Sequence, residues 1–175
     1  RVVVIGGGAI GVSVAYHLAK YGWQDVVLVE KHELTSGSTW MAAGNCSFFH
    51  GNYYCTQVNM KSIELYQALE EETGQSVGWH TTGSIRTADN EGRMEELGYV
   101  YSMNRCLGLD VSWVTPEEIG KLHPLIVTDG FVGGLYWPHD GDVDPNGITK
   151  AKSIVAKKHG AQINTHTMVT GIDRT

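Results

Sequence analysis

The chain opens with the stretch Arg1-Val2-Val3-Val4-Ile5-Gly6-Gly7-Gly8-Ala9-Ile10-Gly11. Its apolar, β-branched start predicts a short strand, its glycines a turn, and residues 12–21 a helix. A second strand is expected over residues 26–30, with Glu30 at its end. A strand, a G-x-G-x-x-G turn, a helix and a second strand ending in an acid are typical of a dinucleotide-binding βαβ unit.

Each glycine of this pattern has a physical role. Gly6 permits the tight turn, Gly8 lets a pyrophosphate approach the backbone, and Gly11 lets the helix pack close to the sheet. The helix N-terminus offers free N–H groups and a partial positive charge to the phosphates. Glu30 can accept hydrogen bonds from a ribose diol and disfavours a 2′-phosphate, which argues against NADP. The alternative, a glycine-rich turn without a ligand, leaves Glu30 unexplained.

Composition narrows the class of protein. The 175 residues suggest one domain or slightly more. Because the net charge is −6 and the chain has no basic run, we do not expect it to bind nucleic acid. No apolar run approaches the roughly eighteen residues of a membrane span. The three cysteines have no CxxC spacing, so we expect reduced thiols, in a bacterial cytoplasm or a mitochondrial matrix, and no metal site. Because the chain starts and stops within strand-like runs, we expect a fragment of a longer protein.

The rest of the chain alternates between helices and short strands. We expect helices over residues 59–73, 90–107, 116–122 and 145–159, and strands over 78–80, 83–87, 110–114, 132–137, 160–163 and 167–170. Residues 34–44 are small and hydroxyl-rich, and Ser38 or Thr39 is expected to cap a short helix there.

The spacing of the strands separates two classes of dinucleotide site. In a nicotinamide-type domain the third strand follows one crossover after the second. Here about 130 residues separate Glu30 from Gln162. We therefore predict an α/β fold in which an FAD-binding, Rossmann-like βαβ unit is interrupted by an α+β insertion that begins a substrate domain with a mainly antiparallel sheet. The predicted segments are 1–75 and 144–175 for the FAD-binding domain and 76–143 for the substrate domain.

Several motifs are shared with a known family: Gly6 to Gly11, Glu30-Lys31, Leu34 to Trp40 with Ala42-Ala43-Gly44, Thr82 to Arg86, and Gly133-Gly134-Leu135-Tyr136 through Asp144-Pro145. With these motifs the chain resembles the dimethylglycine and sarcosine dehydrogenase group of the FAD-dependent oxidoreductases similar to D-amino-acid oxidase. The resemblance implies oxidation of a small N-methyl amine, with a hydride passing from the N–CH3 carbon to flavin N5. It also implies that the iminium is hydrolysed or passes its one-carbon unit to folate, and that an electron-transfer flavoprotein is a possible partner of the complete protein.

The same resemblance assigns cofactor-binding positions. It implies that Ala9 and Ile10 lie at the pyrophosphate, that Glu30 and Lys31 hold the adenosine ribose, and that Val169 meets the adenine through its backbone. The segment implied to wrap the pyrophosphate and reach the isoalloxazine consists of Gly37, Ser38, Thr39, Trp40, Met41, Ala42, Ala43 and Gly44.

Met41 departs from the family pattern. In the dimethylglycine dehydrogenases the residue after this tryptophan is a histidine bonded covalently to the flavin. A thioether is not expected to form that link, so the hypothesis is non-covalent FAD, with Met41 packing against the ring as the simpler reading. Met41 also keeps open a non-catalytic regulatory or binding subunit, because the pyruvate dehydrogenase phosphatase regulatory subunit resembles these enzymes and also lacks the flavin-linking histidine.

Other candidates have competing explanations. His50 and His80 fall in expected loops, where either could assist deprotonation of an amine, although surface or core histidines are commoner. The aromatic residues Trp79, Tyr136 and Trp137 could form a wall for a methylated ammonium or belong to the core. The run Asp140 to Asp144 lacks the glycine and glutamate of an EF-hand and is interpreted as a turn followed by an Asp N-cap.

Overall fold

The computed structural model describes residues 1–173 and divides into two compact units. Unit 1 comprises Arg1–Gly44, Leu65–Trp79 and the chain from Val143 onward, and unit 2 comprises Asn45–Glu64 and His80–Asp142. The sequence-based boundaries after residues 75 and 143 stay a prediction for the domains of the protein. Among residues 1–173, none of the helices combines the length and apolar character needed to cross a bilayer.

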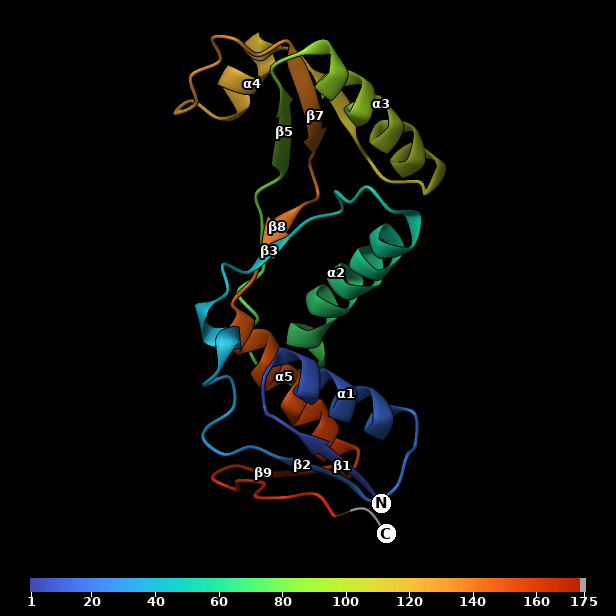
Figure 1. The fold of residues 1–175 in the computed structure, drawn as a ribbon, viewed down its shortest axis with the longest axis vertical. Coiled ribbons are helices and arrows are strands. Elements are labelled where there is room, and N and C mark those ends of the chain that lie inside the picture. The colour runs from blue at the N-terminus through green and yellow to red at the C-terminus, as the bar shows by residue number, and fades with distance from the viewer. Residues whose placement is uncertain (174–175) are drawn as a thin grey trace. The chain divides into compact units, whose positions relative to one another are not determined.

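Unit 1 is built on a three-stranded parallel sheet in the order β1-β2-β9. Its strands are β1 (Val2–Ile5), β2 (Val26–Val29) and β9 (Gln162–Asn164). Helices α1 (Ala9–Lys20) and α5 (Pro145–Lys158) lie side by side next to this sheet (Figure 1), and a short 3-10 helix, η1, spans Ser38–Met41. Leu28 of β2 is in register with Val4 of β1 and with Ile163 of β9. The third strand therefore rejoins the sheet after the long insertion, which confirms the predicted class of fold.

Local sequence explains the two helices. The buried residues of α1 recur at helical spacing: Val12, Ala15, Tyr16 and Ala19. Helix α5 begins with Pro145 at its first position, and the Asp144 carboxylate accepts a hydrogen bond from the Asn146 N–H, as the sequence predicts.

Unit 2 is mainly antiparallel. One sheet has the order β5-β7-β6, formed by β5 (Ser84–Ala88), β7 (Gly133–Trp137) and β6 (Ser112–Val114). A smaller sheet, β3-β8-β4, joins β3 (Asn45–Cys46), β8 (Gly141–Asp142) and β4 (His80–Thr81). The helices are α2 (Tyr53–Thr73), whose second half belongs to unit 1, α3 (Glu91–Cys106) and α4 (Pro116–Leu122). Asn90 caps α3, and Thr115 and Glu118 form the predicted capping box of α4.

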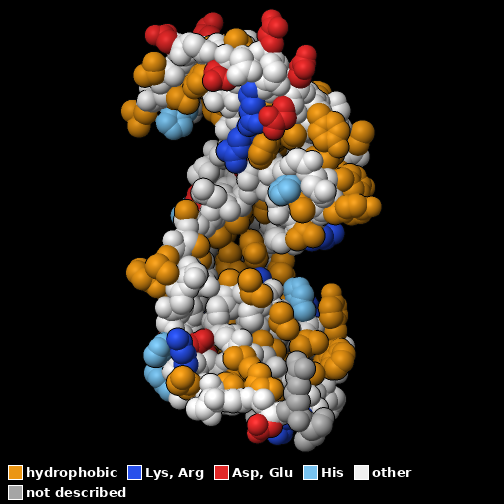
Figure 2. Space-filling model, in the orientation of Figure 1, with side chains coloured by type: hydrophobic (Ala, Val, Ile, Leu, Met, Phe, Trp, Pro, Cys, Tyr) orange, Lys and Arg blue, Asp and Glu red, His pale blue; other side chains and the backbone are white. Residues whose placement is uncertain are grey.

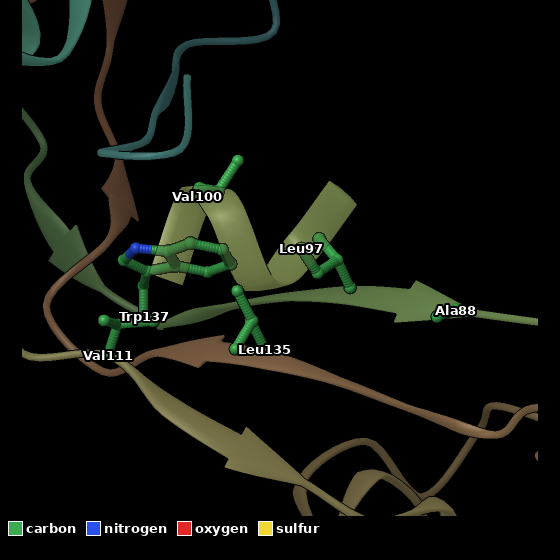
Figure 3. Packing of buried hydrophobic residues seen from close by; sticks show 6 residues of the cluster. All are labelled: Ala88, Leu97, Val100, Val111, Leu135 and Trp137. Atoms are coloured by element: carbon green, nitrogen blue, oxygen red, sulfur yellow. The ribbon is translucent and has the colours of Figure 1, made fainter. Parts of the chain in front are cut away.

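The core of unit 2 lies between α3 and the sheet (Figure 3). Its buried side chains are Ala88, Leu97, Val100, Val111, Leu135 and Trp137. Trp137 is fully buried, and its indole N–H donates to Asn104 Oδ1 at 2.9 Å. This residue is therefore part of the core, and the aromatic-wall alternative is wrong for it.

Two predicted helix starts and one predicted strand are wrong. Helix α1 begins at Ala9 and not at residue 12, because the Gly8 carbonyl already accepts from the Val12 N–H. Helix α2 begins at Tyr53 and not at residue 59, because the Asn52 side chain accepts from two backbone N–H groups of its first turn. Residues 167–170 form no strand; the Thr167 N–H donates instead to the Glu30 carbonyl at 2.7 Å.

Both units carry exposed apolar side chains (Figure 2). On β1, Val3 and Ile5 are about half exposed while their neighbours are more buried. One face of this strand is therefore left uncovered by the part of the chain that the structure describes.

Candidate functional site

The glycine turn between β1 and α1 has a conformation that other residues do not fit. Gly6 has φ of +109°, and its N–H donates to the Val29 carbonyl of β2 at 2.9 Å. A Cβ on Gly11 would lie 2.0 Å from the Gly6 carbonyl oxygen. The first turn of α1 is thus held against the end of β1 at a distance that only glycine allows, and its N-terminus faces the turn.

Glu30, the acidic residue that follows β2, is bonded to this turn. One carboxylate oxygen accepts from the Gly7 N–H at 2.7 Å and the other from the His32 N–H at 2.8 Å. These two backbone donors, Gly7 first, hold the pKa of the Glu30 carboxyl below its usual range. Each oxygen keeps a further lone pair that can accept a hydrogen bond from a ribose hydroxyl. The neighbouring Lys31 is exposed.

Gly7 is a site residue that the sequence analysis missed. A Cβ there would lie 2.7 Å from Leu34 Cδ2 and 2.9 Å from the Glu30 side chain. The signal in the sequence is the unbroken triplet Gly6-Gly7-Gly8, of which the G-x-G-x-x-G pattern explains only the outer two.

The hydroxyl-rich segment returns to the same turn. Thr35 adopts φ of +71°, a strained conformation for a β-branched residue, and its N–H donates to the Gly7 carbonyl at 3.0 Å. The expectation that Ser38 or Thr39 caps a short helix is wrong, because the N-cap of η1 is Gly37 and makes no side-chain bond. Thr39 Oγ1 instead accepts from the Ala9 N–H of α1 at 2.9 Å.

The last residues of this segment are exposed to solvent, and the glycine that ends it has no room for a side chain. Trp40 and Met41 are 59% and 64% exposed, and Ala42 and Ala43 are exposed as well. A Cβ on Gly44, whose φ is +79°, would lie 2.1 Å from the Val143 carbonyl oxygen. The segment is therefore accessible where a flat ring could lie and fixed where it ends.

Other predicted positions lie at different places in the fold. Ile10 is 83% exposed in the first turn of α1. Val169 is half-buried and follows Thr167, which is bonded to the Glu30 carbonyl. His50 and His80 belong to unit 2, where a nitrogen of His50 accepts from the Asn52 N–H and His80 lies 3.2 Å from the Asp142 carboxylate. The structure therefore groups the cofactor candidates in unit 1 and gives the two histidines local polar partners.

Asp140 is a further polar centre that sequence reasoning missed. Its carboxylate is buried and accepts from Ser47 Oγ at 2.6 Å, from the Phe48 N–H at 2.9 Å and from Ser84 Oγ. The sequence offers no signal for these bonds, because the donors lie far from Asp140 along the chain.

The glycine turn fits the pyrophosphate and ribose of a dinucleotide. It combines a helix N-terminus, a backbone that a ligand can approach and a carboxylate at the end of the second strand. Together with a parallel βαβ unit interrupted by an antiparallel one, these features define a dinucleotide-binding protein of the FAD type.

Comparison with known proteins gives the family. The chain belongs to the FAD dependent oxidoreductase (DAO) family, whose profile matches residues 1–175. It is 45% identical over 170 residues to the mitochondrial dimethylglycine dehydrogenase of Rattus norvegicus, a match that covers 97% of this chain and 20% of that protein. It is 37% identical over 169 residues to the mitochondrial pyruvate dehydrogenase phosphatase regulatory subunit of Mus musculus, covering 97% and 19%. The resemblance seen in the sequence motifs is confirmed.

A solved structure shows the same fold. The L-proline dehydrogenase of P. horikoshii matches with a TM-score of 0.89 and 29% identity, over 98% of this chain and 45% of that one. The chain thus spans about one fifth of the length of these two curated relatives and less than half of this structural neighbour.

Proposed function

We propose that this chain forms the FAD-binding part of an enzyme that oxidises a small N-methylated amine of the dimethylglycine or sarcosine type. The observation that supports the proposal is the site at the N-terminus of α1, where the glycine turn Gly6 to Gly11, Glu30 and Thr39 meet. The chain that carries this site is 45% identical to a dimethylglycine dehydrogenase. When bound, FAD supplies the acceptor for the hydride that the amine gives up.

The residues of this chain bind and orient the cofactor. In the first turn of α1, the backbone N–H groups of Gly8, Ile10 and Gly11 are offered to the pyrophosphate, and Ala9, whose N–H already donates to Thr39 Oγ1, lies beside them. Glu30 accepts from the ribose hydroxyls, with Lys31 beside it, and Val169 contributes its backbone near the adenine. Residues 37–44 cover the pyrophosphate and reach the isoalloxazine, where the exposed side chains of Trp40 and Met41 are available to a flat ring.

Met41 makes the attachment of FAD non-covalent in this proposal. Its thioether stands where the resemblance places a flavin-linking histidine. Acid precipitation of the holoprotein tests this: the flavin should stay in the supernatant. A yellow pellet, or a flavin-bearing tryptic peptide, contradicts it.

The function as a whole is tested by spectroscopy of the complete purified protein, because this chain alone is expected to bind FAD poorly and to be inactive. Absorption bands at roughly 370 and 450 nm would identify bound flavin. Anaerobic addition of dimethylglycine or sarcosine should then bleach the 450 nm band with one of them. A flavin band that neither of these amines bleaches would rule out this substrate class.

A second candidate function is a non-catalytic regulatory subunit. It is favoured by the 37% identity to the pyruvate dehydrogenase phosphatase regulatory subunit together with Met41 in place of the histidine. A complete purified protein that shows no flavin bands and does not bind added FAD would select this function. For the complete protein, we propose residence in a mitochondrial matrix or a bacterial cytoplasm. Its proposed partners are folate or an electron-transfer flavoprotein.

A further inference from the structure

Helix α1 lacks a cap of its own. Its N-cap residue is Gly8, which has no side chain and so makes no capping hydrogen bond. The first turn of an α-helix leaves backbone N–H groups without intrahelical partners, and a side-chain oxygen usually accepts from one of them. Here the oxygen comes from a residue thirty positions further along the chain, since Thr39 Oγ1 accepts from the Ala9 N–H at 2.9 Å.

Gly8 and Thr39 fit one another. A Cβ on Gly8 would lie 3.0 Å from Thr39 Oγ1, tighter than an ordinary van der Waals contact. The absence of a side chain at Gly8 therefore leaves room for the threonine hydroxyl as well as for a ligand.

Other bonds bring the threonine to this place. The Thr35 N–H donates to the Gly7 carbonyl at 3.0 Å, and the Trp40 N–H donates to the Thr35 carbonyl at 3.3 Å. Residues 35–40 are thus folded back on the glycine turn at two points, Thr35 and Thr39. The Thr39 hydroxyl is the one side-chain group among these bonds.

We propose that Thr39 is a positioning residue that caps α1 from a distant position in the same chain. It holds residues 35–41 against the helix N-terminus before a dinucleotide binds. The residues around the pyrophosphate site are then already ordered in the free protein. The entropy lost in ordering them is lost when the protein folds and not when the ligand binds. That Thr39 caps α1 is inferred from the hydrogen bond between its hydroxyl and the Ala9 N–H. Its consequence for the ligand rests on the proposed function.

Hydrogen exchange of the cofactor-free protein tests the cap directly. In Thr39→Val, which keeps the shape and removes the hydroxyl, exchange of the Ala9 amide should rise by about 3- to 30-fold. Thr39→Ser should restore the slow exchange, and Ser36→Ala, which removes an exposed hydroxyl from the same segment, should leave it unchanged.

Binding of ADP, the half of FAD that carries the pyrophosphate, gives the second readout. Its Kd in calorimetry should rise by about 3- to 30-fold in Thr39→Val and recover in Thr39→Ser. Faster Ala9 exchange in a protein that binds neither ADP nor FAD would support the cap and refute the proposed function. Weaker ADP binding with unchanged Ala9 exchange would overturn the cap and leave Thr39 as a direct ligand. Unchanged exchange and binding would overturn the inference and leave the flavin function intact.

Discussion

Replacing Lys152 by methionine should stabilise the protein at neutral pH. Lys152 lies on α5, is 4% exposed, and has its ammonium 3.1 Å from Ser13 Oγ and 4.9 Å from the centre of the Tyr66 ring. On α1, burial lowers the pKa of His17, and the charge of Lys152 contributes to the shift. Burial lowers the pKa of the Lys152 ammonium from 10.5 to about 8.

The size of the effect follows from that pKa. A fall from 10.5 to about 8 costs the folded state about 3 kcal/mol when both states hold the proton, and the Tyr66 ring offsets a part of it. Below pH 8 the full cost is present. Between pH 8 and 10.5 the folded protein releases the proton while the unfolded chain keeps it, so the stability of the parent rises with pH. Lys152→Met should therefore gain about 2–3 kcal/mol at pH 7 and almost nothing above pH 10.5.

Urea unfolding from pH 7 to 10.5 measures this difference, and Lys150→Met, an exposed lysine of the same helix, is the matched control. The control should change stability by less than about 0.5 kcal/mol at every pH. A second readout is His17, whose pKa is lowered first by burial and then by Lys152, and should rise in Lys152→Met. A stability difference that does not vary with pH, or an unchanged His17 titration, would refute the reasoning.

Three further predictions concern the other unusual positions. Thr35→Asn should raise the free energy of unfolding by about 1 kcal/mol, because asparagine tolerates the left-handed backbone better; a lower denaturation midpoint would contradict the strain. Asp140→Asn should lower that free energy by about 2–4 kcal/mol, since an amide cannot serve all three donors, and a loss under about 0.5 kcal/mol in urea unfolding would argue against a buried carboxylate. Met41→His should retain flavin in the acid-precipitated pellet where the parent releases it; equal release from both would show that a histidine there does not form the link.

The parts of the fold that could be predicted from sequence depend on neighbours along the chain. A β-branched run, a glycine with positive φ and an apolar stripe at helical spacing each act within a few residues. That is why the glycine turn at Gly6 and the helix after it could be predicted. The return of a third strand was predicted on other grounds, from the long gap between Glu30 and Gln162. The start of α2 was missed for a local reason as well, because the polar Asn52 cap lies one turn before its apolar pattern begins.

The parts that could not be predicted depend on contacts between distant residues. Glu30 binds the N–H of Gly7, 23 positions away, and Asp140 binds Ser47, 93 positions away. No propensity or spacing rule encodes such a pair. Glu30 was correctly singled out as an acid at a strand end, but its two backbone donors could come only from three-dimensional structure.

The glycines of the site combine both kinds of information. Gly11 and Gly44 are each required by a carbonyl oxygen that a Cβ would approach to about 2 Å, in one case from the adjacent turn and in the other from Val143. The Val143 carbonyl shares its peptide unit with the Asp144 N–H, which donates to the Val77 carbonyl at 2.9 Å. The Gly6 carbonyl shares its peptide unit with the Gly7 N–H, which donates to Glu30 at 2.7 Å, so rotating either carbonyl away would break a hydrogen bond. Gly8 differs, because its nearest neighbour is a rotatable threonine hydroxyl. The rigid part of this site is therefore set by backbone against backbone, and its adjustable part is the single side chain of Thr39.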